Sequence, residues 1–332
     1  MSRFLLPQRI AKVVRKEMKT SQVDVLVIGG GPAGLAAAIE LKKSGVKSVR
    51  VIERERVAGG VPRHSFHPGY GLRDFRQFLS GPRYAKKYVD AAVASGVQIS
   101  TLSTATEWVN DSQIRVTSPA GIETISARAI ILATGARERA RAARAVPGKR
   151  PAGIYTTGSL QQATYLEDLA IGSRAVIVGA EHVSFSAVMT LKHAGVKTVA
   201  MLTDKNKHES IGLVRLVLGI WYRFKLITKT EIVEILGDKR VTGVRIRRRA
   251  VESVIACDTI VFTGNWIPDN ELVRRGGFAI DSIYKSPVVN ATAQISGTSI
   301  YAIGNLVLPI KAADQCAVDA KIVAKKVAAS LR

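Results

Sequence analysis

The stretch VDVLVIGGGPAGLAAAIELKKSGVKSVRVIERE, residues 23–55, decides the fold of this chain. Its opening VDVLVI is a short apolar run that predicts a β-strand, and LAAAIELKKSG is typical of a helix built from small residues. VRVIE then predicts a second strand. Between the first strand and the helix, Gly29, Gly31 and Gly34 have the spacing G-x-G-x-x-G. This order of elements predicts a unit that binds the diphosphate of an adenine dinucleotide.

Each glycine of this loop has a mechanical reason. Gly29 permits the tight turn, Gly31 lets the backbone approach a pyrophosphate, and Gly34 lets the helix pack closely on the strand. The N-terminus of the helix then presents free N–H groups and a positive dipole end to the phosphates. Glu53 closes the second strand, 19 residues beyond Gly34, where its carboxylate can accept hydrogen bonds from both ribose hydroxyls.

A second stretch repeats this plan. SRAVIVGAEHVSFSAVMTLKHAGVKTVAMLTD, residues 173–204, predicts strand, loop, helix and strand, but Glu181 and Ser184 stand at the second and third glycine positions. A carboxylate at position 181 would repel a pyrophosphate in a desolvated cleft. We therefore expect a second domain that keeps the scaffold of a dinucleotide site and has lost the site itself. An ordinary packing loop, or a new role for Glu181 or His182 toward the substrate, are the alternatives.

Length and composition are those of a two-domain globular protein, with 332 residues of which 47% are hydrophobic. Cys257 and Cys316 form no CxxC pair and predict neither a disulfide framework nor a metal site, so a reducing, cytoplasmic location is expected. The net charge of +23 favours anionic partners. Because the basic residues form short groups without interleaved aromatic residues, nucleic-acid binding is not expected.

Two segments allow a contact with a membrane surface or a partner. Residues 1–21 form a basic extension with apolar residues at near-helical spacing, and residues 213–227 are apolar and aromatic but contain Arg215, Arg223 and Lys225. Residues 1–21 are expected to be a solvated extension or a helix packed on the body of the protein. Residues 213–227 are expected to form a buried helix or strand. Peripheral contact of the basic extension with the inner face of a membrane is the alternative. No apolar run reaches the ~20 residues that span a bilayer.

Two later stretches favour a flavin as the bound nucleotide. IILATGARE, residues 130–138, predicts a strand that ends in a glycine turn, and residues 301–331 predict a strand, a Gly-Asn turn, a loop and a long final helix. With these motifs in this order, residues 22–330 resemble the two-dinucleotide-domain flavoproteins, the pyridine nucleotide-disulfide oxidoreductase-like family. The resemblance implies FAD as the cofactor. The residues that match the FAD-binding motifs are Gly29, Gly31, Pro32, Ala33, Gly34, Glu53, Arg54, Gly60, Ala133, Thr134, Gly135, Gly304, Asn305, Ala312 and Ala313.

Two residues depart from the pattern of the family. Asn305 stands where the family usually has an Asp that reaches the ribityl chain of the flavin, and an Asn can still hydrogen-bond a hydroxyl. Ser186 stands where relatives that use NAD(P)H usually carry a Glu beside the nicotinamide. The final helix is expected to begin near Ala312 and to aim its positive end at the N1–C2=O edge of the flavin, which would stabilise a reduced, anionic flavin.

A closer resemblance concerns one branch of the family. Residues 59–85, 141–162 and 262–269, together with VGAEHVSFSAV, are similar to the flavin subunits of opine oxidases, hydrogen cyanide synthase and dye-linked proline or hydroxyproline dehydrogenases, and to related glycerol-3-phosphate dehydrogenase-like proteins. Those enzymes oxidise a C–N or C–O bond and pass electrons to partner subunits or a quinone. Such members often carry a cysteine-rich iron–sulfur segment. Since this chain has no cysteine cluster, electrons are expected to leave through another chain, a quinone or oxygen.

The segment RHSFHPGY supplies the candidates for catalysis, which are Arg63, His64, His67 and Tyr70. Relatives with disulfide chemistry place redox cysteines near here. Oxidation of an amine or alcohol by hydride transfer needs a group that accepts the N–H or O–H proton, and a histidine titrates in the right range. His67 is favoured as this base ahead of His64, while Arg63 or Arg73 could hold a substrate carboxylate. The alternative is that these residues order the loop or bind the flavin phosphates.

The predicted architecture is α/β, with two Rossmann-like, doubly wound domains in three layers. A discontinuous FAD-binding domain comprises residues 22–150 plus 266–332, and a degenerate NAD(P)-type domain comprises residues 151–265. The predicted function is that of the flavin chain of an FAD-dependent dehydrogenase, which oxidises an amino-acid-like or hydroxy small molecule and uses a partner subunit or quinone as the acceptor. The rivals are an NAD(P)H-dependent flavin reductase for an acidic carrier or quinone, and an FAD-binding assembly subunit without turnover.

Overall fold

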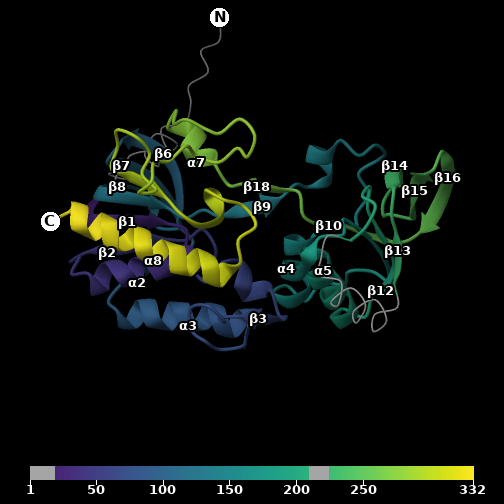
Figure 1. The fold of residues 1–332 in the computed structure, drawn as a ribbon, viewed down its shortest axis with the longest axis horizontal. Coiled ribbons are helices and arrows are strands. Elements are labelled where there is room, and N and C mark those ends of the chain that lie inside the picture. The colour runs from purple at the N-terminus through teal and green to yellow at the C-terminus, as the bar shows by residue number, and fades with distance from the viewer. Residues whose placement is uncertain (1–18, 209–223) are drawn as a thin grey trace, which may run out of the picture. The chain divides into compact units, whose positions relative to one another are not determined.

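A computed structural model of the protein describes residues 19–208 and 224–332 (Figure 1). The chain divides into two compact units. Unit 1 comprises the described residues up to Gly60 together with Lys87–Gly135 and Asn270–Arg332, and unit 2 comprises Val61–Lys86 and the described part of Ala136–Asp269. Residues 61–86 and 136–150 thus pack with unit 2, although the sequence motifs assign them to the FAD-binding domain. Their membership of that functional domain stays a prediction.

Unit 1 is built on a seven-stranded sheet. Its parallel strands, in spatial order, are β5 (Gln98–Ser100), β2 (Val49–Ile52), β1 (Lys19–Ile28), β8 (Gly121–Leu132) and β19 (Ile300–Ala302). Its antiparallel strands are β7 (Gln113–Ser118) and β6 (Thr104–Asn110). Strand β8 has different partners along its length, because its first half pairs with β7 and its last three residues pair with β19. The sheet of unit 1 therefore needs strands from distant parts of the chain.

Both faces of this sheet are buried, which explains why VDVLVI is a continuous apolar run. On one face, Leu26 and Ile28 of β1 join Ile130 and Leu132 of β8 in a hydrophobic core. Val25 and the other alternate residues point to the opposite face. The helices of unit 1 are α2 (Pro32–Lys43), α7 (Glu271–Arg275) and α8 (Ala313–Ser330), while α3 (Gly81–Ala94) runs across the boundary between the units. Figure 1 shows α2 and α8 side by side, and buried alanines on both helices permit this close packing.

Unit 2 is built on a five-stranded parallel sheet packed between helices and a second sheet. The parallel strands, in spatial order, are β10 (Ile154–Thr156), β17 (Thr259–Phe262), β11 (Arg174–Val178), β12 (Lys197–Leu202) and β13 (Lys225–Ile227). Helices α4 (Thr157–Tyr165) and α5 (His182–His193) pack on one face of the sheet. An antiparallel sheet covers the other face with β14 (Thr230–Leu236), β15 (Gly243–Arg248) and β16 (Val251–Ala256). These layers are the α/β architecture with parallel sheets that the sequence predicts.

Short elements complete unit 2. They are η1 (Val61–His64), η2 (Arg141–Arg144), the antiparallel pair β3 (Pro68–Tyr70) with β4 (Leu79–Ser80), and the antiparallel pair β9 (Ala136–Glu138) with β18 (Trp266–Pro268). The pairing of β9 with β18 explains why the chain after Gly135 belongs to unit 2.

Most of the basic N-terminal extension lies outside the described residues. Residues 19–21 are described, and they begin β1 and pair with Glu123–Ile125 of β8. Of the apolar segment 213–227, the part up to residue 223 also lies outside the described residues, while Lys225–Ile227 forms β13. Within the ranges 19–208 and 224–332, no helix is long and apolar enough to cross a membrane.

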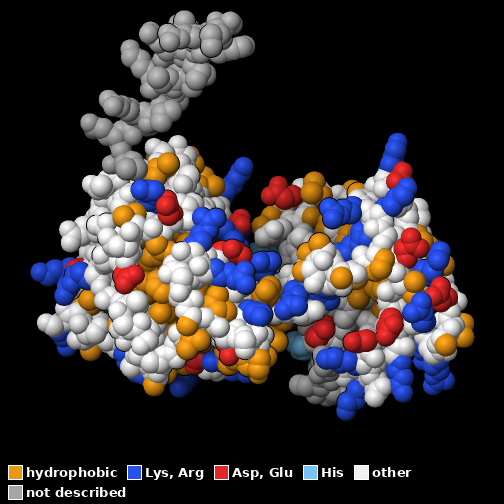
Figure 2. Space-filling view, turned by 90° about the horizontal axis from the view of Figure 1, so that it is seen from above, with side chains coloured by type: hydrophobic (Ala, Val, Ile, Leu, Met, Phe, Trp, Pro, Cys, Tyr) orange, Lys and Arg blue, Asp and Glu red, His pale blue; other side chains and the backbone are white. Residues whose placement is uncertain are grey.

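On the face drawn in Figure 2, the basic side chains are spread over several places. Figure 2 shows Lys and Arg side chains scattered over the visible face, with Asp and Glu side chains among them. The basic run RIRRR, residues 245–249, begins in β15, where Val244 and Ile246 are buried and Arg245 and Arg247 alternate with them. Arg247 there forms an ion pair of 2.8 Å with Glu252 of β16. This run is thus the solvated face of a sheet.

Candidate functional site

The first glycine loop, residues 29–34, joins β1 to α2. Gly29 has a φ of +112°, and a Cβ there would overlap the carbonyl oxygen of Ala133. A Cβ at Gly34 would overlap the carbonyl oxygen of Gly29. Gly31 differs, because the only described atom within 4 Å of a Cβ built there, its own chain neighbours apart, is the Cα of Gly60 at 3.9 Å. Gly29 and Gly34 are therefore required by packing, whereas Gly31 borders open space.

The open space beside Gly31 lies at the N-terminus of α2. Gly31 is the N-cap of this helix, and no side chain caps it. The N–H groups of the first helical turn have no intrahelical partner, so they are available to an anion. Gly59 donates its backbone N–H to the carbonyl oxygen of Gly30 over 2.8 Å, which holds the chain at Gly60 beside the loop. The arrangement fits a diphosphate.

Glu53 directly follows β2 and is 7% exposed. Its Oε2 accepts the backbone N–H of Gly30 over 2.8 Å, and its Oε1 accepts that of Glu55 over 2.9 Å. These bonds fix the carboxylate beside the first glycine loop. Each oxygen keeps a second lone pair with which it can accept a ribose hydroxyl. Arg54, the next residue in the chain, has an exposed side chain.

The turns after β8 and β19 leave the sheet at the same edge as the first glycine loop. The N–H of Ala133 donates to the carbonyl of Ile28 over 2.8 Å, and that of Ile303 donates to Leu132 over 3.0 Å. Ligands of open α/β sheets bind outside the carboxyl ends of the parallel strands. The predicted residues that gather at this edge are Gly29, Pro32, Ala33, Ala133, Thr134, Gly135, Gly304 and Asn305.

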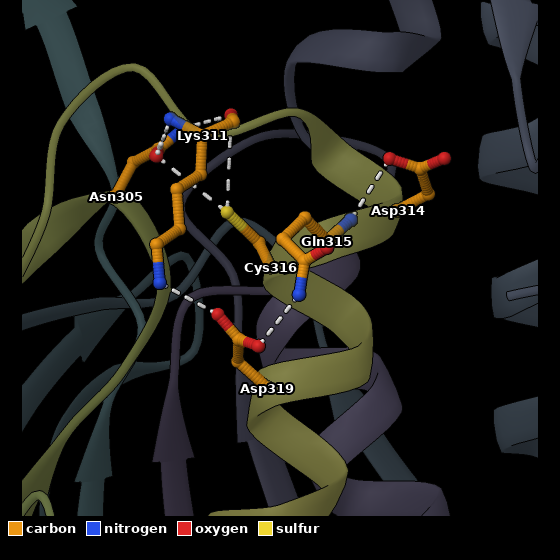
Figure 3. Close-up of polar contacts among 6 residues, drawn as sticks. All are labelled: Asn305, Lys311, Asp314, Gln315, Cys316 and Asp319. Carbon is orange, nitrogen blue, oxygen red and sulfur yellow. Dashed lines mark hydrogen bonds and ion pairs between the residues drawn. The ribbon is translucent and has the colours of Figure 1, made fainter. Parts of the chain in front are cut away.

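Asn305 forms hydrogen bonds to Lys311, at the end of the loop that leads to α8 (Figure 3). Its Oδ1 accepts the backbone N–H of Lys311 over 2.9 Å, and its Nδ2 donates to the carbonyl oxygen of Lys311 over 3.2 Å. The thiol of Cys316 donates to the same Oδ1 over 3.5 Å. The side-chain amide of Asn305 thus binds both the N–H and the C=O of Lys311. Its predicted contact with the ribityl chain rests on the second N–H of Nδ2.

Lys311 is also tied to α8 through its side chain (Figure 3). Its Nζ forms an ion pair of 2.7 Å with Oδ2 of Asp319, and Gln315 donates to Oδ1 over 2.8 Å. Burial raises the pKa of Asp319, but the hydrogen bonds from Lys311 and Gln315 outweigh it and leave this pKa below its usual value. The loop is therefore fastened at Asn305 and at Asp319.

Helix α8 begins where the sequence predicts. Ala312 is its N-cap and Ala313 its first residue, and no side chain caps this end. Asp314, in the first turn, is 2% exposed, and its Oδ1 accepts the N–H of Gln315 over 2.8 Å. The orientation of this helix end toward the flavin ring stays a prediction.

The second glycine loop, residues 179–184, keeps the backbone of the first. Glu181 is the N-cap of α5 with φ −85° and ψ 174°, and Gly31 is the N-cap of α2 with φ −80° and ψ −177°. Gly179 has a φ of +128°, close to the +112° of Gly29. The two loops therefore differ in their side chains and hardly in the path of the chain.

The carboxylate of Glu181 lies within this second loop. Its Oε2 accepts the hydroxyl of Thr263 over 2.9 Å and that of Ser184 over 3.2 Å. A Cβ at Gly264 would come within 2.6 Å of Cδ of Glu181, so the carboxylate lies directly against that glycine. Ser184 and Thr263 are fully buried. Residues of unit 2 thus hold a negative charge at the position where the first loop is open.

A second carboxylate and an arginine bind the backbone of Gly264. Oε1 of Glu138 accepts the N–H of Gly264 over 3.1 Å, and Oε2 accepts that of Gly158 over 3.0 Å. Arg144 donates from Nη2 to the carbonyl oxygens of Thr263 at 2.8 Å and Gly264 at 2.9 Å. Burial raises the pKa of Glu138 and lowers the pKa of Arg144. Sequence reasoning missed this cluster, since its members are far apart in the chain.

The residues proposed for catalysis lie in unit 2. Arg63 and His64 belong to η1, and Tyr70 ends β3. His67 donates from Nδ1 to the carbonyl oxygen of its neighbour Pro68 over 2.9 Å, and its ring stacks on that of Tyr70 at 5.3 Å. Burial lowers the pKa of His67 and raises the pKa of Tyr70.

His64 has a partner that sequence reasoning missed. This histidine is 4% exposed, and its Nδ1 lies 3.3 Å from Oε1 of Gln161 on α4. Gln161 donates from Nε2 to the hydroxyl of Ser186 over 2.7 Å. Gln161 shares the buried face of α4 with Leu160 and Thr164, so helical periodicity would have placed it inward. In the described part of the chain, no three His, Cys, Asp or Glu side chains are placed to hold a metal ion.

Solved structures with the same fold include two oxidoreductases. Thioredoxin reductase of T. acidophilum superposes with a TM-score of 0.77 at 22% identity, over 93% of this chain and 98% of that one. L-proline dehydrogenase of P. horikoshii superposes with a TM-score of 0.69 at 19% identity, over 93% of this chain and 56% of that one.

Sequence comparison shows the family. The family model described as pyridine nucleotide-disulphide oxidoreductase matches residues 23–322. One chain of the opine oxidase of Rhizobium meliloti is 25% identical over 85% of this chain and 58% of that one. Thioredoxin reductase of Mycolicibacterium smegmatis is 29% identical over 87% of this chain and 91% of that enzyme. This chain thus spans little more than half of the opine oxidase chain. With a first glycine loop, Glu53 and three strand ends that fit an adenine dinucleotide, the chain belongs to the pyridine nucleotide-disulphide oxidoreductase family and is a flavin-dependent oxidoreductase whose cofactor is FAD.

Proposed function

We propose that the protein is an FAD-dependent dehydrogenase that oxidises an amino-acid-like or hydroxy small molecule and passes the electrons to a partner subunit or a quinone. The observation that carries this proposal is the carboxylate of Glu181, which Thr263 and Ser184 hold inside the second glycine loop. Two like unit charges 4 Å apart at an effective dielectric constant of 20 repel by about 4 kcal/mol. That energy corresponds to a loss of roughly a thousandfold in affinity for a nicotinamide dinucleotide.

The thiols of the chain support a chemistry other than disulfide reduction. Burial raises the pKa of Cys257 and of Cys316 to about 11. A thiol attacks a disulfide as its thiolate, so neither side chain is activated for that reaction. Cys316 is moreover engaged with Asn305, and Cys257 belongs to the other unit.

The residues have the following roles in the proposed reaction. FAD, when bound, supplies the acceptor for a hydride. The first glycine loop and α2 hold its diphosphate, and Glu53 holds its ribose. As the C–H bond of the substrate breaks and its electron pair leaves with the hydride, the adjacent N–H or O–H bond breaks and its proton passes to His64 or His67. Arg63 or Arg73 binds a carboxylate of the substrate. Tyr70 belongs to the same segment as Arg63 and the two histidines.

A separate electron acceptor is part of this proposal. The similar opine oxidase chain is named as one subunit of its enzyme, which supports a partner protein. The net charge of +23 favours an acidic partner or a surface of anionic lipid, and the basic N-terminal extension would be the place for peripheral membrane contact. We place the protein in the cytoplasm.

The test is anaerobic reduction of the FAD-loaded protein, followed by the flavin absorbance in a stopped-flow instrument. A panel of opines, L-proline, hydroxyproline, glycine and glycerol 3-phosphate is compared with NADH and NADPH. Bleaching by a member of the panel, with slow or no bleaching by the nicotinamides, is expected. Rapid bleaching by NADH or NADPH would overturn the proposal in favour of an NAD(P)H-dependent flavin reductase, which the 29% identity to a thioredoxin reductase supports as the second candidate. A flavin that no compound reduces would indicate an assembly subunit without turnover.

A further inference from the structure

Residues 72–78 of unit 2 form a short loop that presents apolar and basic side chains to solvent. The exposed residues of this 72–78 loop are Leu72, Arg73, Arg76, Gln77 and Phe78. The two large apolar side chains, Leu72 and Phe78, are 52% and 67% exposed. Apolar groups that are exposed together, with charged residues beside them, mark binding surfaces more often than single exposed apolar residues do.

Backbone hydrogen bonds close the 72–78 loop at Gly71. The carbonyl oxygen of Gly71 accepts the N–H of Phe75 over 3.2 Å and that of Gln77 over 3.0 Å. Gly71 has a φ of +83°, and a Cβ there would come within 3.2 Å of the carbonyl oxygen of Gln77, so this position favours glycine. Leu72 follows Gly71, and Phe78 follows Gln77. The two apolar residues therefore lie at the base of the same closed loop.

The middle of the 72–78 loop is anchored to α3 by its inward residues, Asp74 and Phe75. Tyr84 of α3 is fully buried and donates its hydroxyl to Oδ2 of Asp74 over 2.6 Å. The ring of Phe75 meets that of Tyr84 edge to face, with centroids 5.7 Å apart. The loop is thus ordered in the free protein. An ordered loop loses less conformational entropy when it binds a partner than a flexible loop does.

Charge indicates which partner fits this surface. Residues 61–86 contain five Lys and Arg side chains and one acidic side chain, Asp74, which is turned toward Tyr84. Arg76 is exposed beside the two apolar residues, and the proposed reaction does not use it. A guanidinium can bind a carboxylate through two parallel hydrogen bonds, and Arg and Phe are both enriched in protein interfaces. The surface therefore suits an acidic protein.

Two other occupants fit less well. A second copy of this chain carries the same net charge of +23, and like charges repel. A surface of anionic lipid attracts clusters of about four to eight Lys or Arg residues, and membrane interfaces are enriched in Trp and Tyr. Residues 72–78 contain two Arg and neither Trp nor Tyr. The composition of the 72–78 loop thus favours a protein partner.

We propose that Leu72, Arg76 and Phe78 form a docking surface for an acidic protein. Leu72 and Phe78 enter an apolar recess of the partner, and Arg76 binds a carboxylate at the rim of that recess. The inference rests on the proposed function for the existence of a partner protein, and it names the surface that binds this partner. It concerns binding alone and uses only residues of unit 2.

A peptide of defined composition tests the proposal. The probe is a dye-labelled helical peptide with leucines on one face, glutamates along both edges of that face, and one benzoylphenylalanine for photo-cross-linking. A matched peptide has Lys in place of each Glu. The FAD-loaded protein is expected to bind the Glu peptide at least about 10-fold more tightly than the Lys peptide, as measured by fluorescence anisotropy. After irradiation, mass spectrometry should locate the cross-links at residues 72–78, and cross-links confined to other parts of the chain would overturn the proposal.

Variants separate the docking surface from the general positive charge. Leu72→Ser, Phe78→Ser and Arg76→Glu are each expected to raise the Kd for the Glu peptide about 5- to 30-fold. The matched controls in unit 2 are Val254→Ser, at a valine of β16 that is 57% exposed, and Arg150→Glu, at an exposed arginine. They should change the Kd less than about 2-fold. Equal losses in the loop variants and the controls would show that net charge alone attracts the peptide, which would refute the docking surface.

Two further measurements test the other occupants. Phe78→Ser should leave unchanged both the cosedimentation with vesicles of phosphatidylcholine and phosphatidylglycerol and the molar mass from light scattering. Loss of vesicle binding in this variant would assign the 72–78 loop to a bilayer, and loss of a dimer would assign it to a second copy, and either result would overturn the proposal.

The inference and the proposed function fail in different ways. Peptide binding is measured without any substrate, so its outcome does not depend on which compound reduces the flavin. Reduction by NADH or NADPH alone would overturn the proposed function, while the cross-links and the Kd values would still report whether the 72–78 loop binds an acidic partner.

Discussion

Gly31 and Glu181 occupy equivalent N-cap positions with nearly the same backbone angles, φ −80° and ψ −177° for the first and φ −85° and ψ 174° for the second. One borders open space, and the other places a carboxylate against Gly264. The first glycine loop is thus open at this position, whereas the second glycine loop contains the carboxylate of Glu181. At this position the difference is the side chain of Glu181, on which the proposed function rests.

Replacement of Glu181 by glycine should open the second loop to a nicotinamide dinucleotide. Removal of the charge and of the side chain is expected to raise the rate of flavin reduction by NADH or NADPH at limiting concentration by roughly 10- to 1000-fold. The loss of the bonds from Thr263 and Ser184 costs about 1 kcal/mol of unfolding free energy, since these hydroxyls lie 2.8 Å apart and can bind each other. Stopped-flow reduction and urea unfolding measure the two effects.

Glu181→Gln is the control that separates charge from volume. It keeps the shape of the side chain and removes the charge, so it should gain less than the glycine variant. If Glu181→Gly retained its flavin and gained nothing with either nucleotide, the carboxylate would not be the obstacle.

Two alanine variants distinguish a glycine kept for the cofactor from one kept for packing. Gly31→Ala should leave the unfolding free energy of the flavin-free protein within about 0.5 kcal/mol, because Gly31 has an ordinary φ and open space beside it. Its Kd for FAD should rise about 10-fold or more. Gly34→Ala should instead destabilise the flavin-free protein by about 1–3 kcal/mol, because its Cβ would overlap the carbonyl of Gly29. Equal effects of both variants on the flavin-free protein would contradict this assignment.

Asn305→Asp tests the two hydrogen bonds between the Asn305 side chain and the backbone of Lys311. An aspartate can accept the N–H of Lys311 but cannot donate to its carbonyl oxygen, so the flavin-free protein should lose about 1–3 kcal/mol of stability. Asn290→Asp is the matched control, because the Oδ1 of Asn290 accepts the N–H of Thr292, a bond that a carboxylate serves equally, and its Nδ2 donates a long, exposed bond of 3.3 Å to Gln294. The control should change stability by less than about 0.5 kcal/mol. Thermal unfolding measures both variants. Equal losses of stability in Asn305→Asp and Asn290→Asp would show that the hydrogen bonds to Lys311 do not stabilise the protein.

The stability of unit 2 should depend on pH through Asp258. Burial raises the pKa of this carboxyl, but hydrogen bonds from Ser173 and Arg174 outweigh it and bring the pKa to about 2. Because the folded value lies below the ordinary 3.8, the stabilisation is fully present above about pH 4 and is lost as the pH falls toward 2. Asp258→Asn should therefore cost about 1–3 kcal/mol at pH 7, and the difference from the unmodified protein should shrink between pH 4 and 2.

A surface pair provides the comparison for this effect. Asp238 forms an ion pair with Lys149 in which both side chains are at least 70% exposed. Asp238→Asn should change the unfolding free energy by less than about 1 kcal/mol. Urea unfolding at several pH values measures both variants, and a pH-independent cost of Asp258→Asn would contradict the assignment.

The sequence predicts the two glycine loops, their strands and the start of α8, because each is written in consecutive residues with a clear period. It also identifies Glu181 as a departure from the glycine pattern of the second loop. It does not indicate where the carboxylate of Glu181 points, since Thr263, its partner, is 82 residues away. Helical periodicity predicts that Gln161 faces inward, but it does not predict its partners His64 and Ser186, because η1 and α5 meet α4 only in the fold.

The division of the chain is the other feature that local patterns do not reveal. Residues 61–86 directly follow the first dinucleotide motif, and nothing in their own composition tells which unit they will contact. The packing of η1 on α4 and the pairing of β9 with β18 assign these neighbouring segments to unit 2. Asn305 and Lys311 are close in sequence, but the side-chain amide of Asn305 binds both the C=O and the N–H of Lys311. A sequence pattern does not specify that geometry.

The place of β19 beside the end of β8 has a consequence for how the protein is made. A ribosome releases the chain from its N-terminus, so β1, β2 and β8 emerge long before β19 and α8. Every segment of unit 2 has been synthesised by Asp269, whereas unit 1 still lacks the strand that completes its sheet and the helix that packs on α2. Unit 1 is therefore begun first and finished last, and the residues predicted to hold FAD come together only after β19 and α8 have been synthesised.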